Sequence, residues 1–279
     1  MKYIYKLFRV FGIDLLQLAY AVYSLPKFLL DLLRYVLLKS RKERLAMIMP
    51  VLGENLKPSA SLDRHYFVQD IICAELVIKN FDKTHLDVGS RVDGFISKVA
   101  LHCQLDVLDI RPLKLPLLNV TFKVGDLMSS TFLSSFERRY NSVSCLHTIE
   151  HFGLGRYGDK LDPNGFKVGL YNLQGLVKPG GLLFLSTPVG RSRTVFNAHR
   201  VFSPNEIFQE LSEMELLHAV VINDDGNIYG FGDEPSKVGI SAFTKDFNYG
   251  LGIFVFGKRP ASENLFDFKS GVIEVQSVN

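Results

Sequence analysis

The 279-residue sequence predicts an α/β protein with a doubly wound, mostly parallel seven-stranded sheet, an antiparallel edge strand and an N-terminal helical extension. Three observations predict this fold class. Short apolar runs typical of buried strands alternate with helical segments from residue 66 onward. A glycine turn follows the first of these strands, where the chain enters a helix. The first 49 residues differ from the rest because they are basic and amphipathic.

Changes in composition divide the chain into four parts. Residues 1–49 are expected to form amphipathic, basic helices, and residues 50–65, rich in Pro, Gly, Ser and Asn, to form a linker. The α/β domain is expected to cover residues 66–260, and residues 261–279 to form a C-terminal tail. The usual size of domains leaves room in this chain for one large domain and its extension, but not for two enzymatic domains.

Apolar residues of the N-terminal part recur at helical spacing. They predict a helix over residues 4–22, a break at Pro26 and a second helix over residues 27–39. No stretch without charge in this region reaches the ~20 residues that cross a bilayer. Two interpretations stay open, namely a helix that lies in a membrane interface and a helix that packs on its own domain or on a partner subunit. The apolar positions of the first helix are Ile4, Leu7, Phe8, Phe11, Leu15, Leu18 and Val22.

The charge is distributed unevenly along the chain. Residues 1–44 hold nine Lys/Arg and three Asp/Glu out of 32 and 29, so this segment carries +6 and the rest carries −3. The basic segment suits an anionic membrane surface, whereas the balance of the remainder argues against general nucleic-acid binding. Cys73, Cys103 and Cys145 lie in apolar segments without metal-ligand spacing. We expect them to be buried thiols in a reducing compartment.

The predicted elements follow one another in the order of a parallel sheet with crossover helices. Helices are expected over residues 66–80, 94–101 and 166–176, and a turn over residues 178–181. Ser203 and Glu206 form a capping box around Pro204, so a further helix begins there. The last two strands are expected to be an antiparallel pair at the edge of the sheet. The seven strands are expected at residues 84–88, 105–110, 120–124, 142–147, 182–186, 217–222 and 252–256.

Acidic residues stand where three successive strands end. Asp87 and Gly89 follow the first strand, Asp109 ends the second, and Asp126 follows the third. The carboxyl ends of parallel strands meet at one edge of a sheet, so these residues are expected to surround one ligand. Gly89 lets the backbone approach that ligand. Asp109, 22 residues after Asp87, is placed to bind both hydroxyls of an adenosine ribose, and Asp126 suits the adenine amino group.

A second polar cluster follows the fourth strand. His147, Glu150 and His151 stand at the strand end, and His199 lies in a polar loop after the fifth strand. The functional interpretation is that one of them is a general base for an acceptor. The alternatives are a hydrogen-bonded pair of neutral histidines and a divalent metal held by Glu150 with the two histidines. The metal is disfavoured because no further carboxylate lies nearby.

Residues 63–70, 87–94, 109–113, 147–163 and 197–204, together with the glycine turn at 178–181, carry a family resemblance. The chain resembles class I S-adenosylmethionine-dependent methyltransferases. More narrowly, over about residues 55–260, it resembles the methyltransferase-like domain-of-unknown-function family 268, seen in bacterial polysaccharide gene clusters and in nematodes. The resemblance implies a Rossmann-like fold and S-adenosyl-L-methionine as cofactor. The cofactor-binding residues that it implies are Asp87, Gly89, Ser90, Arg91, Gly94, Asp109, Asp126 and Leu127.

The resemblance also implies a reaction, namely methyl transfer to a hydroxyl of a sugar or glycan precursor in polysaccharide biosynthesis. The enzyme would act in the cytoplasm, on a small-molecule or glycan acceptor, with residues 1–44 touching the inner face of the membrane. One departure matters, because Arg91 stands where the usual loop has its second glycine. It favours the alternative of a catalytically inactive methyltransferase-fold binding module tethered to a membrane. A nicotinamide-dependent oxidoreductase is disfavoured, since no G-x-G-x-x-G follows the first strand.

Overall fold

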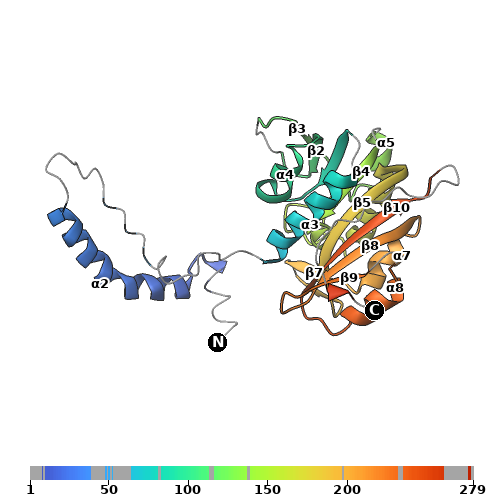
Figure 1. The fold of residues 1–279 in the computed structure, drawn as a ribbon. Helices are drawn as coiled ribbons and strands as arrows, with labels where there is room; N and C mark the ends of the chain where they lie inside the picture. The colour runs from blue at the N-terminus through green and yellow to red at the C-terminus, as the bar shows by residue number, and fades with distance from the viewer. Residues whose placement is uncertain are drawn as a thin grey trace. The chain divides into compact units, whose positions relative to one another are not determined.

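The computed structural model describes residues 8, 10–38, 48, 50, 52, 64–80, 83–112, 116–136, 139–196, 198–231, 235–260 and 276–277. The chain separates into two compact units, Met1–Leu62 and Asp63–Asn279. Both are drawn in Figure 1.

The first unit contains α2 (Leu15–Leu38), a 24-residue helix that continues through Pro26. The predicted break at Pro26 was therefore wrong. Proline removes one main-chain donor and crowds the carbonyl four residues earlier, which bends a helix rich in leucine without ending it. Figure 1 shows α2 bent along its length. The predicted helical residues 4–7 lie outside the described part of the chain. Each helix in the described ranges is too short or too polar to cross a bilayer.

The second unit is built on one sheet, with nine strands among the described residues in the order β11-β9-β8-β10-β5-β4-β1-β2-β3. Five neighbouring strands are parallel: β3 (Val120–Val124), β2 (Gln104–Asp109), β1 (Thr84–Val88), β4 (Tyr140–Leu146) and β5 (Val177–Val189). The next strand, β10 (Gly250–Lys258), is antiparallel to both β5 and β8 (Met214–Ile222). This arrangement confirms the predicted doubly wound, mostly parallel sheet.

The predicted number of strands was wrong, since the sheet extends past β8. β9 (Ile228–Phe231) pairs with β8, and β11 (Gln276–Ser277) pairs with β9. The β8–β10 pair is antiparallel as expected, but it does not form the edge. Four and two residues are too few for a periodic signal, and β11 lies in the segment expected to be a tail. A separate hairpin joins β6 (Arg193–Val195) and β7 (His199–Val201).

Helices cover both faces of the sheet (Figure 1). One hydrophobic cluster joins the sheet to α3 (Arg64–Asn80), η2 (Val92–Ile96) and α4 (Ser97–Val99). The other joins it to α5 (Phe132–Ser135), α6 (Gly165–Leu176), α7 (Pro204–Glu210) and α8 (Lys237–Thr244). β10 contributes to both, because alternate side chains of a strand face opposite sides. Ile253 and Val255 belong to the first cluster, Phe254 and Phe256 to the second.

Several predicted boundaries moved. The helix expected at residue 94 begins at Val92 as a π-helical turn, and α3 begins at Arg64, inside the expected linker. The expected turn at residues 178–181 is part of β5, although Gly180 keeps a φ of +79°. The capping box is confirmed, since the Ser203 amide donates to Glu206 at 2.8 Å. All three cysteines are buried and free, as predicted. The sequence did not predict α5 or α8.

Candidate functional site

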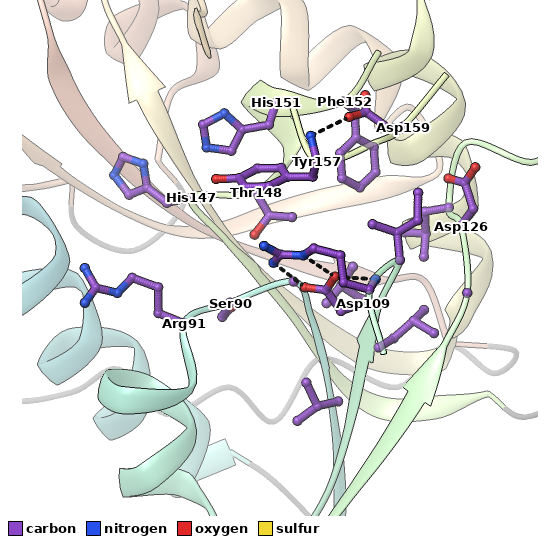
Figure 2. Close-up of a pocket in the computed structure, with 18 of the residues that line it drawn as sticks. Ser90, Arg91, Asp109, Asp126, His147, Thr148, His151, Phe152, Tyr157 and Asp159 are labelled. Atoms are coloured by element: carbon purple, nitrogen blue, oxygen red, sulfur yellow. Dashed lines mark hydrogen bonds and ion pairs between the residues drawn. The ribbon is translucent and has the colours of Figure 1, made fainter. Parts of the chain in front are cut away.

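A cavity of about 640 Å³ lies at the carboxyl ends of β1, β2, β3 and β4 (Figure 2). The strand order reverses between β1 and β4, and open α/β sheets bind their ligands at such a point. The cavity brings together eight of the predicted site residues: Gly89, Ser90, Arg91, Asp109, Asp126, Leu127, His147 and His151. The other four, Asp87, Gly94, Glu150 and His199, lie outside its lining.

The glycine loop after β1 allows close approach to the cavity. Gly89 has a φ of +69°, in the left-handed region that side chains avoid. A Cβ atom at this position would stand 2.4 Å from the Cγ2 of Thr148. The loop can therefore pack this closely against the residues after β4 only because Gly89 has no side chain. Any larger residue would push these two elements apart and change the cavity.

The carboxylate of Asp87 lies beneath this loop. Oδ1 accepts from the Ser90 hydroxyl at 2.6 Å and from the Ser144 hydroxyl at 2.5 Å, and Oδ2 accepts from the Ser90 amide at 3.1 Å. Both oxygens are occupied by the protein, and the side chain is completely buried. Burial raises the pKa of Asp87 to about 6, although these hydrogen bonds oppose the shift. Asp87 therefore holds the glycine loop in place and does not face the cavity.

His85 extends this buried network through β1 and β4. Its Nδ1 lies 2.7 Å from the Ser142 hydroxyl and its Nε2 lies 2.8 Å from the Ser144 hydroxyl. Ser144 gives its proton to Asp87, so it can only accept from His85, which places the His85 proton on Nε2. Burial lowers the pKa of His85 to about 3, so the imidazole is neutral. The network is satisfied at every one of these atoms.

Asp109 ends β2 inside the cavity, as predicted, but its carboxylate is paired. The Arg111 guanidinium donates to Oδ1 at 3.0 Å and to Oδ2 at 2.9 Å, and the Arg111 amide donates to Oδ1 at 2.8 Å. The same guanidinium lies 4.5 Å from the centre of the Tyr157 ring (Figure 2). A ligand that takes Asp109 must displace Arg111 from at least one oxygen.

Tyr157 belongs to a compact loop built around Asp159. The Asp159 carboxylate accepts from the main-chain amides of Gly153 at 2.9 Å, Gly155 at 3.1 Å and Tyr157 at 3.1 Å. This fixes the tyrosine ring over the cavity beside Arg111 (Figure 2). Asp126 and Leu127 also line the cavity, and the Asp126 carboxylate accepts from the Met128 amide at 2.8 Å.

Arg91 stands where the usual loop has its second glycine. Its side chain does not occupy the space that a glycine would leave open at this position. Its guanidinium pairs with Asp93 at 2.7 Å and lies 5.0 Å from the centre of the Tyr66 ring. Figure 2 shows its side chain directed away from Asp109 and Tyr157. Gly94 serves packing, because a Cβ there would stand 1.8 Å from the carboxylate of Asp70.

His147 and Glu150 form a buried pair at the end of β4. His147 Nδ1 lies 2.7 Å from Glu150 Oε1, and the two side chains are 2% and 1% exposed. Burial acts to raise the pKa of Glu150, but the charge and hydrogen bond of His147 outweigh it and hold that pKa below its usual value. An ionised carboxylate only accepts, so Nδ1 carries a proton, and whenever the ring is uncharged its lone pair lies on Nε2.

Two atoms of this pair have no hydrogen-bond partner among the described residues, namely His147 Nε2 and Glu150 Oε2. The backbone at His147 also has a φ of +49°, which is uncommon for a residue with a side chain. Buried polar atoms are normally paired, and residues held in sparsely populated conformations gather at functional sites. Both observations single out His147.

The two other predicted histidines have different surroundings. His151 Nδ1 lies 2.7 Å from the Ala198 carbonyl oxygen and 3.5 Å from Arg156. Burial lowers the pKa of His151, with Arg156 and His147 adding to the decrease and Glu150 opposing it. His199 lies on β7, outside the cavity lining. Within the described residues, no group of three or more His, Cys, Asp or Glu side chains is arranged to hold a metal ion.

Sequence reasoning missed many of the residues that line the cavity, among them Tyr66, Arg111, Thr148 and Tyr157. Arg111 and Thr148 each lie within two residues of a predicted site residue, and that proximity was the available signal. Tyr66 comes from α3, far away in the sequence; it lies in the stretch 63–70 that carries the family resemblance, but no site role was assigned to it.

A family model described as "Caenorhabditis protein of unknown function, DUF268" matches residues 120–224, in agreement with the narrower resemblance. Among proteins with a curated description, none matches the chain. The fold is similar to that of the N-methyltransferase NodS from Bradyrhizobium japonicum WM9 in complex with S-adenosyl-L-homocysteine. The two are 13% identical, with 71% of this chain and 89% of NodS covered and a TM-score of 0.48.

Two structures from Burkholderia thailandensis are also similar. The 1,6-didemethyltoxoflavin-N1-methyltransferase is 13% identical, with 71% of this chain and 80% of that chain covered and a TM-score of 0.46. An O-methyltransferase family protein is 15% identical, with 70% of this chain and 56% of that chain covered and a TM-score of 0.44.

Proposed function

We propose that this protein is an S-adenosylmethionine-dependent methyltransferase that methylates a hydroxyl of a sugar or glycan precursor. The observation that carries the proposal is the cavity at the strand ends. Its lining includes the acidic ends of β2 and β3 and also His147, whose buried Nε2 has no hydrogen-bond partner among the described residues. The residues suited to bind a nucleoside and the residue suited to act as a general base therefore line the same cavity.

The residues present fit the cofactor. The turn at Gly89 carries the main chain along the cavity wall, and Asp109 stands where two ribose hydroxyls can replace Arg111. Apolar side chains, among them Ile110, Phe122 and Leu127, line the part of the cavity suited to a purine ring. When bound, S-adenosyl-L-methionine supplies a methyl group on a sulfonium, which an oxygen nucleophile takes by in-line displacement.

His147 and Glu150 supply the proton transfer that such an acceptor needs. A hydroxyl must lose its proton as it reacts, and His147 Nε2 is the acceptor atom. Glu150 holds the ring through Nδ1, fixing the lone pair on Nε2, and its negative charge stabilises the imidazolium that forms. His151 is a weaker candidate because Arg156, near its Nδ1, disfavours a second positive charge. Holding the reactants in line contributes roughly 7–11 kcal/mol in well-oriented systems.

Transfer of a tritiated methyl group tests the proposal. The full chain is incubated with methyl-labelled S-adenosyl-L-methionine and a panel of monosaccharides, sugar phosphates and nucleotide sugars. We expect label in a sugar, in an amount that grows with the concentration of the chain. Tight binding of S-adenosyl-L-homocysteine without transfer to any acceptor would instead support the inactive binding module.

We also propose that the N-terminal segment holds the enzyme on an anionic membrane surface. α2 exposes large apolar side chains along its length, among them Leu16, Leu29 and Leu33, and residues 1–44 carry a net charge of +6. Each Lys or Arg near such a surface adds about 1 kcal/mol. This is the combination of apolar face and positive charge that interfacial helices use.

Vesicle flotation tests the membrane proposal. The full chain should float with vesicles of phosphatidylcholine and phosphatidylserine, and salt should weaken the association. Leu29→Glu with Leu33→Glu should abolish flotation. Leu118→Glu with Leu161→Glu, a matched change at two exposed leucines of the α/β domain, should not. No flotation of the unmodified chain, together with a lower melting temperature of the Leu29/Leu33 variant, would show that α2 packs on protein instead.

A further inference from the structure

A row of rings from three separate elements stands beside His147. His65 of α3 and Tyr249, just before β10, stack with ring centres 5.5 Å apart and planes 3° from parallel. His199 of β7 meets Tyr249 edge-on at 5.0 Å. His65 in turn lies 6.2 Å from the His147 ring. We call the rings of His65, Tyr249 and His199 the ring shelf.

The ring shelf is part-exposed, whereas His147 beside it is buried. Neither His65 nor Tyr249 lines the cavity assigned to the cofactor, so the shelf lies outside the lining of that cavity. Flat aromatic surfaces at the mouth of a site bury the apolar face of a ligand while leaving its polar edge free. A sugar ring has that division, with C–H bonds on its faces and hydroxyls around its edge.

Two arginines bring positive charge to the same place. Arg193 donates to the main-chain oxygen of Asn248, next to Tyr249, at 2.6 Å. Arg156 donates to the main-chain oxygen of Ala198, next to His199, at 2.8 Å. In the described part of the chain neither arginine forms an ion pair with a carboxylate. Their charge is therefore available to a ligand.

The surroundings of His199 agree with this picture. Burial lowers the pKa of His199; the nearby His151, Arg193 and Arg156 lower it further, and Glu150 opposes them. Burial and these nearby positive groups therefore disfavour a charge on His199, whose ring is suited to stacking and hydrogen bonding.

We infer that the ring shelf binds the acceptor, and that this acceptor is a sugar ring bearing a carboxylate or phosphate group. This inference rests on the proposed function. The ring lies against Tyr249, the anionic group faces Arg156 and Arg193, and a hydroxyl at the edge reaches His147 Nε2. A neutral sugar uses the shelf but leaves the guanidinium groups without a partner.

Saturation-transfer difference NMR tests this inference with three probes. The full chain is measured in the presence of excess S-adenosyl-L-homocysteine. D-Glucuronate and D-glucose 6-phosphate distinguish a carboxylate from a phosphate, and D-glucose is the neutral reference. We expect one or both anionic sugars to bind at least about tenfold more tightly than glucose, as expected for a hydrogen bond to a charged group. Arg193→Gln should reduce that preference several-fold.

The ring itself is tested at Tyr249. Tyr249→Leu should weaken binding of the anionic sugar by about tenfold, and Tyr249→Phe, which keeps the ring, should restore most of it. Tyr171→Leu, at an exposed tyrosine of α6, is the matched control and should bind as the unmodified chain does. Equal binding of glucose and the anionic sugars, or unchanged binding by Tyr249→Leu, overturns the inference if S-adenosyl-L-homocysteine still binds. Loss of S-adenosyl-L-homocysteine binding by the unmodified chain would contradict the proposed function instead.

Discussion

Two buried pairs of histidine and carboxylate stand at neighbouring strands of the sheet, His85 with Asp87 on β1 and His147 with Glu150 after β4. In the first, both ring nitrogens and both carboxylate oxygens have partners within hydrogen-bond distance. In the second, one ring nitrogen and one carboxylate oxygen have none among the described residues, and the backbone is held at positive φ. An imidazole and a carboxylate thus support the structure where all their polar atoms are hydrogen-bonded, and are available for chemistry where some of these atoms are not.

The largest expected effect comes from His147→Asn. Asparagine adopts positive φ more readily than most residues and its amide can still donate to Glu150, but it cannot accept a proton. We expect kcat to fall by ~10²-fold or more, with affinity for S-adenosyl-L-homocysteine and the melting temperature nearly unchanged. A variant that retains full turnover would remove His147 from the mechanism.

The same substitution at the satisfied pair should do the opposite. His85→Asn leaves Ser142 or Ser144 without its partner in the sheet interior. Its cost is the desolvation of an unpaired polar group, about 1–3 kcal/mol in the free energy of unfolding, measured by urea denaturation. Turnover per folded molecule should stay close to that of the unmodified chain. If His85→Asn instead abolished turnover in a stable protein, the division between the two pairs would be wrong.

The satisfied pair also predicts a pH dependence of stability. The folded pKa of Asp87 is raised to about 6, so its contribution to stability is lost as the pH rises toward 6 and beyond. The folded pKa of His85 is depressed to about 3, so its contribution is lost as the pH falls from the ordinary histidine range toward 3. Between about pH 4 and 6 the two slopes oppose each other.

Asp87→Asn removes one of these slopes and leaves the other. The free energy of unfolding of the variant, relative to the unmodified chain, should therefore increase between pH 4 and pH 6.5 by about 1–3 kcal/mol. Urea denaturation of both proteins at several pH values measures the difference, in which all other groups cancel. A difference that does not change with pH would mean that Asp87 is ionised throughout.

The smallest effect concerns Asp109. Its carboxylate is paired, like that of Asp87, but it is partly exposed in the cavity. Arg111→Gln should free the carboxylate for the ribose hydroxyls. An exposed ion pair contributes at most about 1 kcal/mol, so affinity for S-adenosyl-L-homocysteine should rise no more than about fivefold. Weaker binding by this variant would show that Arg111 contacts the ligand itself.

The parts of this molecule that sequence predicted well depend on local patterns. Strands β1 to β4 and the acidic residues at their ends follow from apolar runs and from where they stop. β9 and β11 were missed because a two- to four-residue strand is defined by its neighbour in the sheet. The continuity of α2 through Pro26 was missed because one proline was weighed above many leucines.

Eight of the twelve predicted site residues line the cavity, but the sequence did not distinguish what each of them does. Asp87 and Asp109 look alike at strand ends, yet only the fold shows that Ser90 and Ser144 enclose the first and leave the second in the cavity. Likewise, His147, His151 and His199 were equivalent candidates until their partners were known. Which polar atom is left unsatisfied is a property of packing, and the sequence does not encode it in any local pattern.

The central claim, that the cavity at the strand ends holds the adenosine cofactor, is tested most directly by isothermal titration of the full chain with S-adenosyl-L-homocysteine. We predict binding at a single site, and Asp109→Ala should weaken it by about 1–3 kcal/mol, the cost of unpaired buried polar groups. Leu118→Ala, at an exposed position of the same unit, should bind unchanged. No binding by the unmodified, folded chain, or unaltered affinity in a folded Asp109→Ala variant, would contradict the account.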